Sequence, residues 1–479
     1  MLYDIKKRKN LVKIIAASIA VFITLIFNMI IINNNFIFLL VTFLGVSFLF
    51  FYVYFVIDIS YKAICFFTLL LIFQNFFLII ISPYISKSVF NLLVLIKEVF
   101  VVLVIICSYI KSNNKQNKIA SKKNAVVSIV ILIGMFFASS SSFMARVTSF
   151  RQLIIPFLLF IFGCCIKLEN DQIYKYLRFV VYILVFTSIF GIIEYLYGDD
   201  LWHRLGILNY IEKKGQEAYL GVRGLPLNFY TFDLFYVFNK AFRRMVSFIV
   251  DPVALGQIFA FAIPIVLFNK ILFNNIKRYI CLFFLLVGLV LTFGKGGMLI
   301  VAISFVYCLQ NLSDRKYLSK ILAILVLIAS IFVISYSNDN NLSTSNHFYG
   351  LIENISNLSK YPLGRGMGNA GNFATLYNES DDVGAGESFV GNVIGQLGVI
   401  GICIYTVFFY FLIKELEKCK KTNIQDKMLS IPITGNLIGL IVCSFLSGTS
   451  ISFISSALYF ILIGVIMYNN NKSERYKVN

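Results

Sequence analysis

Long apolar runs separated by short polar breaks recur along the 479 residues of the chain. A helix needs roughly 20 mostly apolar residues to cross a bilayer, and about fourteen runs approach that length. We expect each run to form a transmembrane helix. The expected spans are 14–33, 36–57, 63–83, 89–110, 125–143, 149–166, 178–197, 252–269, 277–293, 297–310, 319–336, 388–413, 429–447 and 451–468.

Composition supports the same fold class. The chain is 59% hydrophobic and 14% charged, whereas soluble domains are about 45–50% apolar and about 25% charged. We therefore predict an all-α polytopic membrane protein with about 12–14 transmembrane helices. The basic start MLYDIKKRKNLVK is followed by no small-residue cleavage site, so we expect a retained helix rather than a signal peptide. The nine cysteines show no metal-ligand spacing, and neither disulfides nor a metal site are expected.

The basic residues concentrate in alternate loops, a distribution typical of the cytoplasmic side of membrane proteins. This positive-inside pattern predicts that both termini are cytoplasmic. It also explains the net charge of +19 through topology and attraction to anionic lipids, so no nucleic-acid partner is needed. The basic loops are 111–124, 167–178, 269–278, 313–320 and 414–427, together with the C-terminal tail.

Two outward segments are much longer than the other loops, and long loops in compact proteins are usually functional or disordered. The aromatic run 228–246 predicts a helix lying at the membrane interface, and 347–360 predicts a second short helix. The chain then divides into an N-terminal bundle, a first outer loop, transmembrane helices around a Lys295 turn, a second outer loop, and C-terminal helices with a tail. The bounds are 1–197, 198–251, 252–336, 337–387 and 388–479.

Several cations face outward, against the positive-inside trend. Arg243 and Arg244 directly precede the span that begins near Pro252, and Lys295 lies between glycines in a short outer turn. Arginines near a span end are often interfacial anchors, and this alternative is about as strong as a functional one. The concentration of cations nevertheless indicates an anionic ligand that approaches from outside.

The outer segment 361–373, YPLGRGMGNAGNF, carries Arg365 and Gly366 among alternate glycines. A dinucleotide site needs a preceding strand, which the pattern does not predict, but backbone amides could form a nest for phosphate. Glu387 follows at the start of a span. It is either a functional carboxylate or an acidic residue favoured by the helix dipole.

Four segments in this order resemble the O-antigen polymerase and O-antigen ligase superfamily, the Wzy-type polymerases. They are RMVSFIVDPVALG, LTFGKGGML, HFYGLIENISNLSKYPLGRGMGNAGNF and GESFVGNVIGQLGVIG, within about residues 240–401. Lys295 stands where the family usually has Arg. Glu387 stands where ligases carry His, which favours the polymerase branch.

The resemblance implies a GT-C-like fold and a metal-independent glycosyltransferase without a cofactor. The substrates would be undecaprenyl-diphosphate-linked oligosaccharides, polymerised on the outer face of a bacterial cytoplasmic membrane. A chain-length regulator and a flippase would be pathway partners. The implied catalytic residues are Arg244, Lys295 and Glu387, with Arg243 as a substitute for Arg244, and the implied substrate contacts are Arg243, Arg365, His347, Arg223 and Gly366.

Three other functions stay open on the sequence. A ligase would move finished glycan to a different acceptor. A flippase would show internal repeats and charges throughout the bundle, whereas these cations cluster on one face. A membrane scaffold would not need two outer loops that carry cations.

Overall fold

The computed structural model describes residues 60–111, 120–217, 220–233, 235–312, 321, 343–371, 387–420 and 424–478. Within these residues, nine helices are long and apolar enough to cross a membrane. The prediction of an all-α, multi-pass membrane protein is thereby confirmed. The expected spans 14–33, 36–57 and, apart from residue 321, 319–336 lie outside the described residues.

The nine long helices reproduce most of the apolar runs. They are α3 (Ser60–Ile81), α4 (Lys87–Lys111), α5 (Ala120–Ala138), α6 (Phe143–Cys165), α7 (Asn170–Tyr197), α13 (Lys295–Leu312), α17 (Phe389–Cys419), α18 (Ile424–Leu446) and α19 (Phe453–Val478). Two further expected spans form helices of 17 residues each, α11 (Pro252–Phe268) and α12 (Asn275–Leu291).

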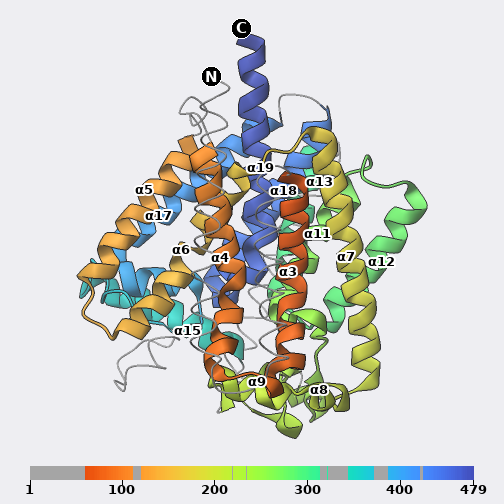
Figure 1. Cartoon of the computed structure of the whole chain (residues 1–479), viewed down its shortest axis with the longest axis vertical. Helices are drawn as coiled ribbons and strands as arrows, with labels where there is room; N and C mark the ends of the chain where they lie inside the picture. The colour runs from red at the N-terminus through yellow and green to blue at the C-terminus, as the bar shows by residue number, and fades with distance from the viewer. Residues whose placement is uncertain are drawn as a thin grey trace.

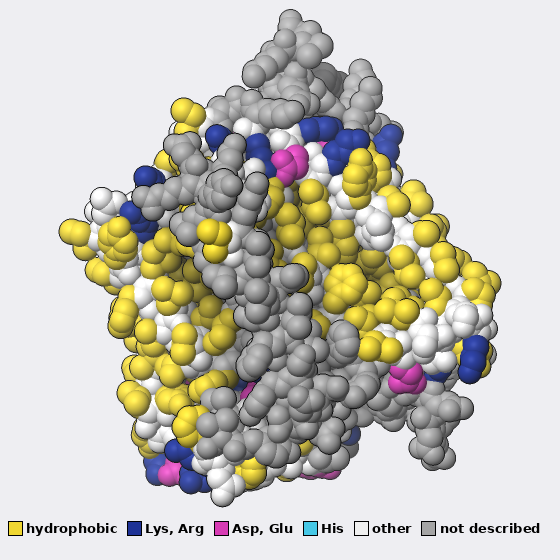
Figure 2. Space-filling view, turned by 180° about the vertical axis from the view of Figure 1, so that it is seen from behind, with side chains coloured by type: hydrophobic (Ala, Val, Ile, Leu, Met, Phe, Trp, Pro, Cys, Tyr) yellow, Lys and Arg dark blue, Asp and Glu magenta, His cyan; other side chains and the backbone are white. Residues whose placement is uncertain are grey.

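The helices run between two ends of the molecule (Figure 1). The C-terminus leaves at one end, and α8 (Asp200–Leu205) and α9 (Ile207–Lys214) lie at the other. Charged side chains gather toward the two ends, with a hydrophobic belt between them (Figure 2). We call the end with the C-terminus the basic end and the end with α8 and α9 the loop end.

Glycines allow α6 and α19 to cross with their backbones in contact. A Cβ added to Gly163 would lie 2.2 Å from the carbonyl oxygen of Ile461, and one added to Gly464 would lie 2.4 Å from that of Phe160. Small residues at helix crossings are typical of membrane bundles, where association depends on close packing. This crossing lies within the buried core of the bundle.

The first outer segment differs from the expectation. Instead of one interfacial helix over 228–246, the described residues form a small antiparallel pair, β1 (Tyr230–Thr231) and β2 (Phe242–Arg243), with α10 (Phe235–Phe238) between them. The predicted helix is therefore wrong. Its aromatic side chains do not form one lipid-facing stripe, because Phe229 is fully buried inside the segment.

The amphipathic helix of this segment is α9. Its buried residues Ile207, Tyr210 and Ile211 have the spacing of one helical face. They pack into a second core cluster together with Trp202 and Phe229. Short 3-10 turns complete the described chain at Ser82–Tyr84, Val222–Gly224, Leu227–Phe229, Ser247–Ile249, Asn357–Ser359 and Gly448–Ile451.

The helix predicted over 347–360 is present as α15 (Ser343–Ser356) and a 3-10 turn, and it leads into the glycine loop. The following long helix, α17, is broken at Gly398, where φ is 56° and ψ is −141°. Side chains rarely tolerate a positive φ. The glycine therefore permits a sharp change of direction within the helix.

Candidate functional site

Arg244 and Lys295 are brought together by the turn between α12 and α13. Arg244 follows β2, and its Nε donates to the carbonyl oxygen of Thr292 at 2.8 Å. Thr292 Oγ1 accepts a hydrogen bond from the Gly294 amide at 3.2 Å, which fixes the turn. Lys295 is the first residue of α13. Residues 292–294 therefore form the connection between α12 and α13.

Asp233, from the segment between β1 and β2, is ion-paired with Lys295 and acts electrostatically on Arg244. Lys295 Nζ lies 2.8 Å from Asp233 Oδ1. Burial lowers the pKa of Arg244, while the carboxylates of Asp251 and Asp233 act in the opposite direction. Lys295 keeps 43% of its side chain exposed. We call Arg244, Lys295 and Asp233 the cation cluster. Its surface is partly open at Lys295.

Arg243 belongs to a different, buried network. Its Nε donates to Asp199 Oδ1 at 2.7 Å, and its guanidinium also pairs with the fully buried Glu194. The Trp202 indole donates to the same Glu194 oxygen at 2.8 Å. Arg243 is therefore already neutralised by two carboxylates, and this position does not favour it as a substitute for Arg244.

Arg223, another expected substrate contact, shares Asp199 with Arg243. Its Nη1 lies 3.2 Å from Asp199 Oδ2, although 75% of the Arg223 side chain is exposed. Burial alone would raise the pKa of Asp199, but hydrogen bonds from Tyr230 and Arg243 outweigh it and lower that pKa. Burial and the carboxylate of Asp199 raise the pKa of Tyr230 to about 12. The network thus holds Asp199 ionised and Tyr230 neutral.

Glu387 lies beside the loop end of α18, as does Lys295. The residue after it, Ser388, caps α17 through the Gly391 amide and donates to the carbonyl oxygen of Ser444 at 3.4 Å. The Gly448 amide donates to the carbonyl oxygen of Glu387. Across α18, a Cβ on Gly296 would lie 2.7 Å from Cys443 Sγ. Ser388, next to Glu387, therefore contacts Ser444 of α18, and Gly296, next to Lys295, lies against the preceding residue, Cys443.

The glycine loop supports the break in α17 instead of presenting free amides. The Arg365 amide donates to the carbonyl oxygen of Gly395 at 2.8 Å, and the Gly366 amide donates to that of Gln396 at 3.2 Å. The Val399 amide donates in return to Pro362 at 2.9 Å. These amides are engaged inside the protein. The Arg365 and Gly366 amides are therefore used to support α17, and the phosphate nest expected in this loop stays a prediction.

The glycine loop is also held from the turn between α5 and α6. Ser139 and Ser141 donate to the carbonyl oxygen of Met367 at 2.6 and 2.7 Å. The Arg365 guanidinium lies 5.4 Å from the centre of the Tyr361 ring. Gln396 is about two helical turns, or ~12 Å, beyond Ser388 along α17. Arg365 is therefore placed away from the first turn of this helix.

His347 lies in α15, but its side chain is outside the described residues. Of the adjacent Lys97 and Glu98 in α4, Glu98 accepts a hydrogen bond from Arg151 Nε at 2.8 Å. Lys97 is buried, with its Nζ 5.7 Å from the centre of the Phe453 ring. This pair links α4 to α6 and α19 and lies apart from the cation cluster.

Sequence reasoning missed the carboxylates that organise the outer segment. Asp233 lies in an aromatic run whose predicted helix is absent, so its approach to Lys295 could not be inferred. Glu194 offered a clearer signal, because an acidic residue inside an apolar run usually has a dedicated partner. The signal would have pointed to a nearby outward cation such as Arg243.

The comparisons with known proteins assign no family. No family model matches the chain, and no curated protein matches it significantly. The likeness to O-antigen polymerases therefore rests on the quoted motifs and stays a prediction.

Proposed function

We propose that the chain polymerises undecaprenyl-diphosphate-linked oligosaccharide repeat units on the outer face of a bacterial cytoplasmic membrane. The observation that carries the proposal is the cation cluster, in which Arg244 is hydrogen-bonded to the turn that carries Lys295, and Lys295 is ion-paired with Asp233. It lies at the end of the apolar bundle opposite the basic end. Both termini would then be cytoplasmic, as the positive-inside pattern predicts.

The chemistry suits this arrangement. A hydroxyl oxygen of the incoming repeat unit attacks the anomeric carbon of the growing chain, the new glycosidic bond forms, and the bond from that carbon to diphosphate breaks. Negative charge then develops on the diphosphate oxygens. Preorganised cations stabilise such charge most effectively where water is partly excluded, and Arg binds phosphate through two parallel hydrogen bonds.

The acceptor hydroxyl must lose its proton to a base. Glu387 is an exposed carboxylate at the start of α17, and the loop end of α18 separates it from the Lys295 turn. We assign it the role of general base, because a carboxylate within reach of the hydroxyl can accept the proton in the transition state. Asp233 positions Lys295 through their ion pair.

The test is complementation of a deletion strain, with polymer length and yield read from gels of extracted polysaccharide. Arg244→Ala and Glu387→Gln should each reduce polymer at least about a hundredfold, as expected for a lost charge stabiliser or base. Arg204→Ala is the matched control, because Arg204 is an exposed outer arginine beyond the cation cluster. Normal polymer from both variants at normal protein abundance would disprove the proposal.

A purified system separates the polymerase from its rivals. With lipid-linked repeat units as the only sugar substrate, a polymerase should produce a ladder and release lipid diphosphate. A ligase would produce a ladder-free product, and only after a separate acceptor is added. A flippase would move the lipid across vesicles and form no new glycosidic bond.

A further inference from the structure

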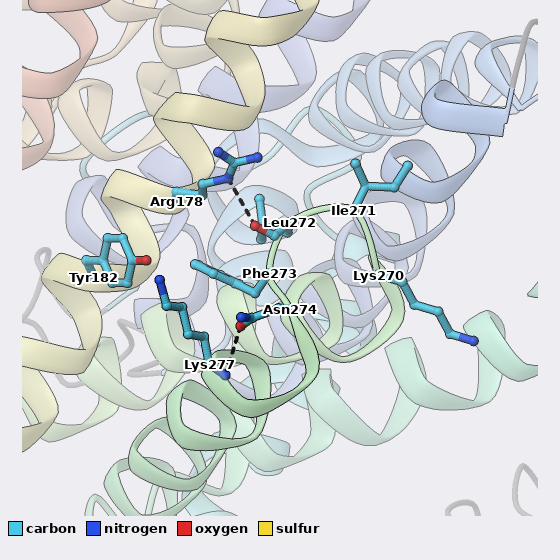
Figure 3. A pocket seen from close by; sticks show the side chains of 8 residues that line it. All are labelled: Arg178, Tyr182, Lys270, Ile271, Leu272, Phe273, Asn274 and Lys277. Carbon is cyan, nitrogen blue, oxygen red and sulfur yellow. Dashed lines mark hydrogen bonds between the residues drawn. The ribbon is translucent and has the colours of Figure 1, made fainter.

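A pocket of about 420 Å³ opens at the basic end between α7 and the turn that joins α11 to α12. Arg178 and Tyr182 line it from α7, and residues 270–274 with Lys277 line it from the turn and from α12 (Figure 3). Arg178 precedes Glu194 by about four and a half helical turns, or ~24 Å. The pocket is therefore remote from the cation cluster and is not used by the proposed reaction.

The charge of this pocket is entirely positive. Arg178, Lys270 and Lys277 contribute cations, and none of the eight lining residues is acidic. Arg178 Nε donates to the carbonyl oxygen of Leu272 at 3.0 Å and so holds the turn in place. Its two Nη groups have no protein partner among the described residues. Arg178 and Lys277 line the same pocket, whereas the Lys270 side chain extends away from both of them (Figure 3).

The first turn of α12 adds to this preference for an anion. Asn274 caps the helix by accepting a hydrogen bond from the Lys277 amide at 3.2 Å. The positive end of the helix dipole then faces the pocket, where it favours negative charge. The Lys277 side chain and the N-terminus of α12 therefore both favour an anion in the pocket.

Apolar side chains continue from the pocket along the membrane-facing surface. On α7, Tyr182 and Phe186 follow Arg178 at intervals of one turn and are 49% and 52% exposed. On α12, Ile280 and Phe283 are 51% and 61% exposed. Such surfaces on membrane helices contact acyl chains. A free phosphate would use the cations alone, whereas a phospholipid uses both the cations and this apolar surface.

We propose that this pocket binds the headgroup of an anionic glycerophospholipid, whose acyl chains lie along α7 and α12. Basic pockets between helices at a membrane surface suit such headgroups. The lipid phosphate bridges Arg178 and Lys277, and so links the third turn of α7 to the first turn of α12. The bound lipid thereby stabilises the packing of α7 against α12.

The test uses the purified full-length chain and phosphatidylglycerol as the probe. Native mass spectrometry in detergent should detect phosphatidylglycerol that stays bound, in preference to phosphatidylcholine. The double variant Lys270→Gln with Lys277→Gln should bind it about thirtyfold more weakly, because each lysine near an anionic surface contributes about 1 kcal/mol. The control Lys123→Gln with Lys414→Gln removes two exposed cations at the same end, on α5 and α17, and should bind normally.

A second measurement separates the lipid from free phosphate. Phosphatidylglycerol should raise the thermal midpoint of the wild type, whereas inorganic phosphate at millimolar concentration should not. Equal stabilisation by phosphate, or equal losses in the test and control variants, would overturn the proposal. Lys277→Glu serves as an independent variant if the double variant folds poorly. Trp202 emission, which reports on the remote loop end, verifies folding in each case.

Discussion

Arg243 and Arg244 are consecutive residues with different surroundings. Arg243 is ion-paired with the fully buried Glu194 and with Asp199, whereas Arg244 Nε donates to the Thr292 carbonyl oxygen beside Lys295. The first arginine holds the outer segment against α7. The second belongs to the partly open cation cluster to which we assign the proposed reaction. Of these two adjacent residues, Arg243 therefore stabilises the fold, and Arg244 is the one to which we assign the proposed chemistry.

Arg243→Ala should destabilise the outer segment by about 3–5 kcal/mol, because it leaves a buried carboxylate without its partner. Trp202 is the only tryptophan of the chain, is fully buried, and donates to Glu194 at 2.8 Å. Its emission should therefore shift to the red in this variant. Arg244→Ala and the exposed-site control Arg204→Ala should leave the emission unchanged. An unshifted spectrum for Arg243→Ala would show that the buried network does not hold the segment.

The stability of the network that Arg243 forms with Glu194, Asp199 and Tyr230 should fall at both low and high pH. The pKa of Asp199 is lowered in the folded protein, so its stabilisation is present above the ordinary carboxylate pKa of about 4 and is lost as pH falls below it. The pKa of Tyr230 is raised to about 12. Its stabilisation is therefore complete below pH about 10 and is lost as pH rises from there toward the folded value.

Trp202 emission measured across pH should accordingly show two transitions, an acid limb at low pH and an alkaline limb at high pH. Tyr230→Phe should remove the alkaline limb and keep an acid one. An alkaline limb of unchanged size in Tyr230→Phe would mean that another group is responsible.

Gly398→Ala should destabilise the protein by about 3 kcal/mol, since the backbone there is open essentially to glycine alone. Its added Cβ would lie 2.2 Å from the carbonyl oxygen of Pro362. Gly134→Ala in α5 is the control, because its Cβ would meet nothing within 4 Å and alanine favours a helix. The thermal midpoint in detergent should fall for the first variant and stay level or rise for the second.

Gly163→Leu should separate α6 from α19, because even a Cβ there meets the Ile461 backbone at 2.2 Å. Overpacking of this kind typically costs about 1–3 kcal/mol, and more where backbone must move. Gly134→Leu offers the same change in size at an open position. Thermal midpoints and folded yield compare the two. Equal loss in both variants would show that leucine at a helix glycine, and not the α6–α19 crossing, is the cause.

Most of the fold could be predicted from the apolar runs in the sequence. Runs such as 63–83 and 429–447 predict helices because their length and composition suit only a bilayer. The Lys295 turn followed from the same pattern, as did the helix that precedes the glycine loop. The hairpin around Asp233 could not be predicted, because its aromatic residues also fit an interfacial helix. Only tertiary packing around Phe229 and Arg244 decides between the two.

The candidate site was predictable only as a set of residue types. Outward Arg, Lys and Glu were visible in the sequence, but which of them meet was not. Arg243 and Arg244 are indistinguishable by position, and the structure separates them through Glu194, far away along the chain. The glycine spacing likewise fitted a phosphate nest. In the structure the Arg365 and Gly366 amides bond to the broken helix α17, a partnership that no local pattern reveals.

The bonds between the glycine loop and α17 have a consequence for how the protein is made. A helix broken within a bilayer leaves backbone groups without partners, at a cost of several kcal/mol for each. The carbonyl groups of Gly395 and Gln396 and the amide of Val399 find those partners in Arg365, Gly366 and Pro362. During synthesis the glycine loop emerges before α17. When α17 enters the membrane, the glycine loop that satisfies its broken backbone has therefore already been translated. The loop and the helix must then fold together in the membrane.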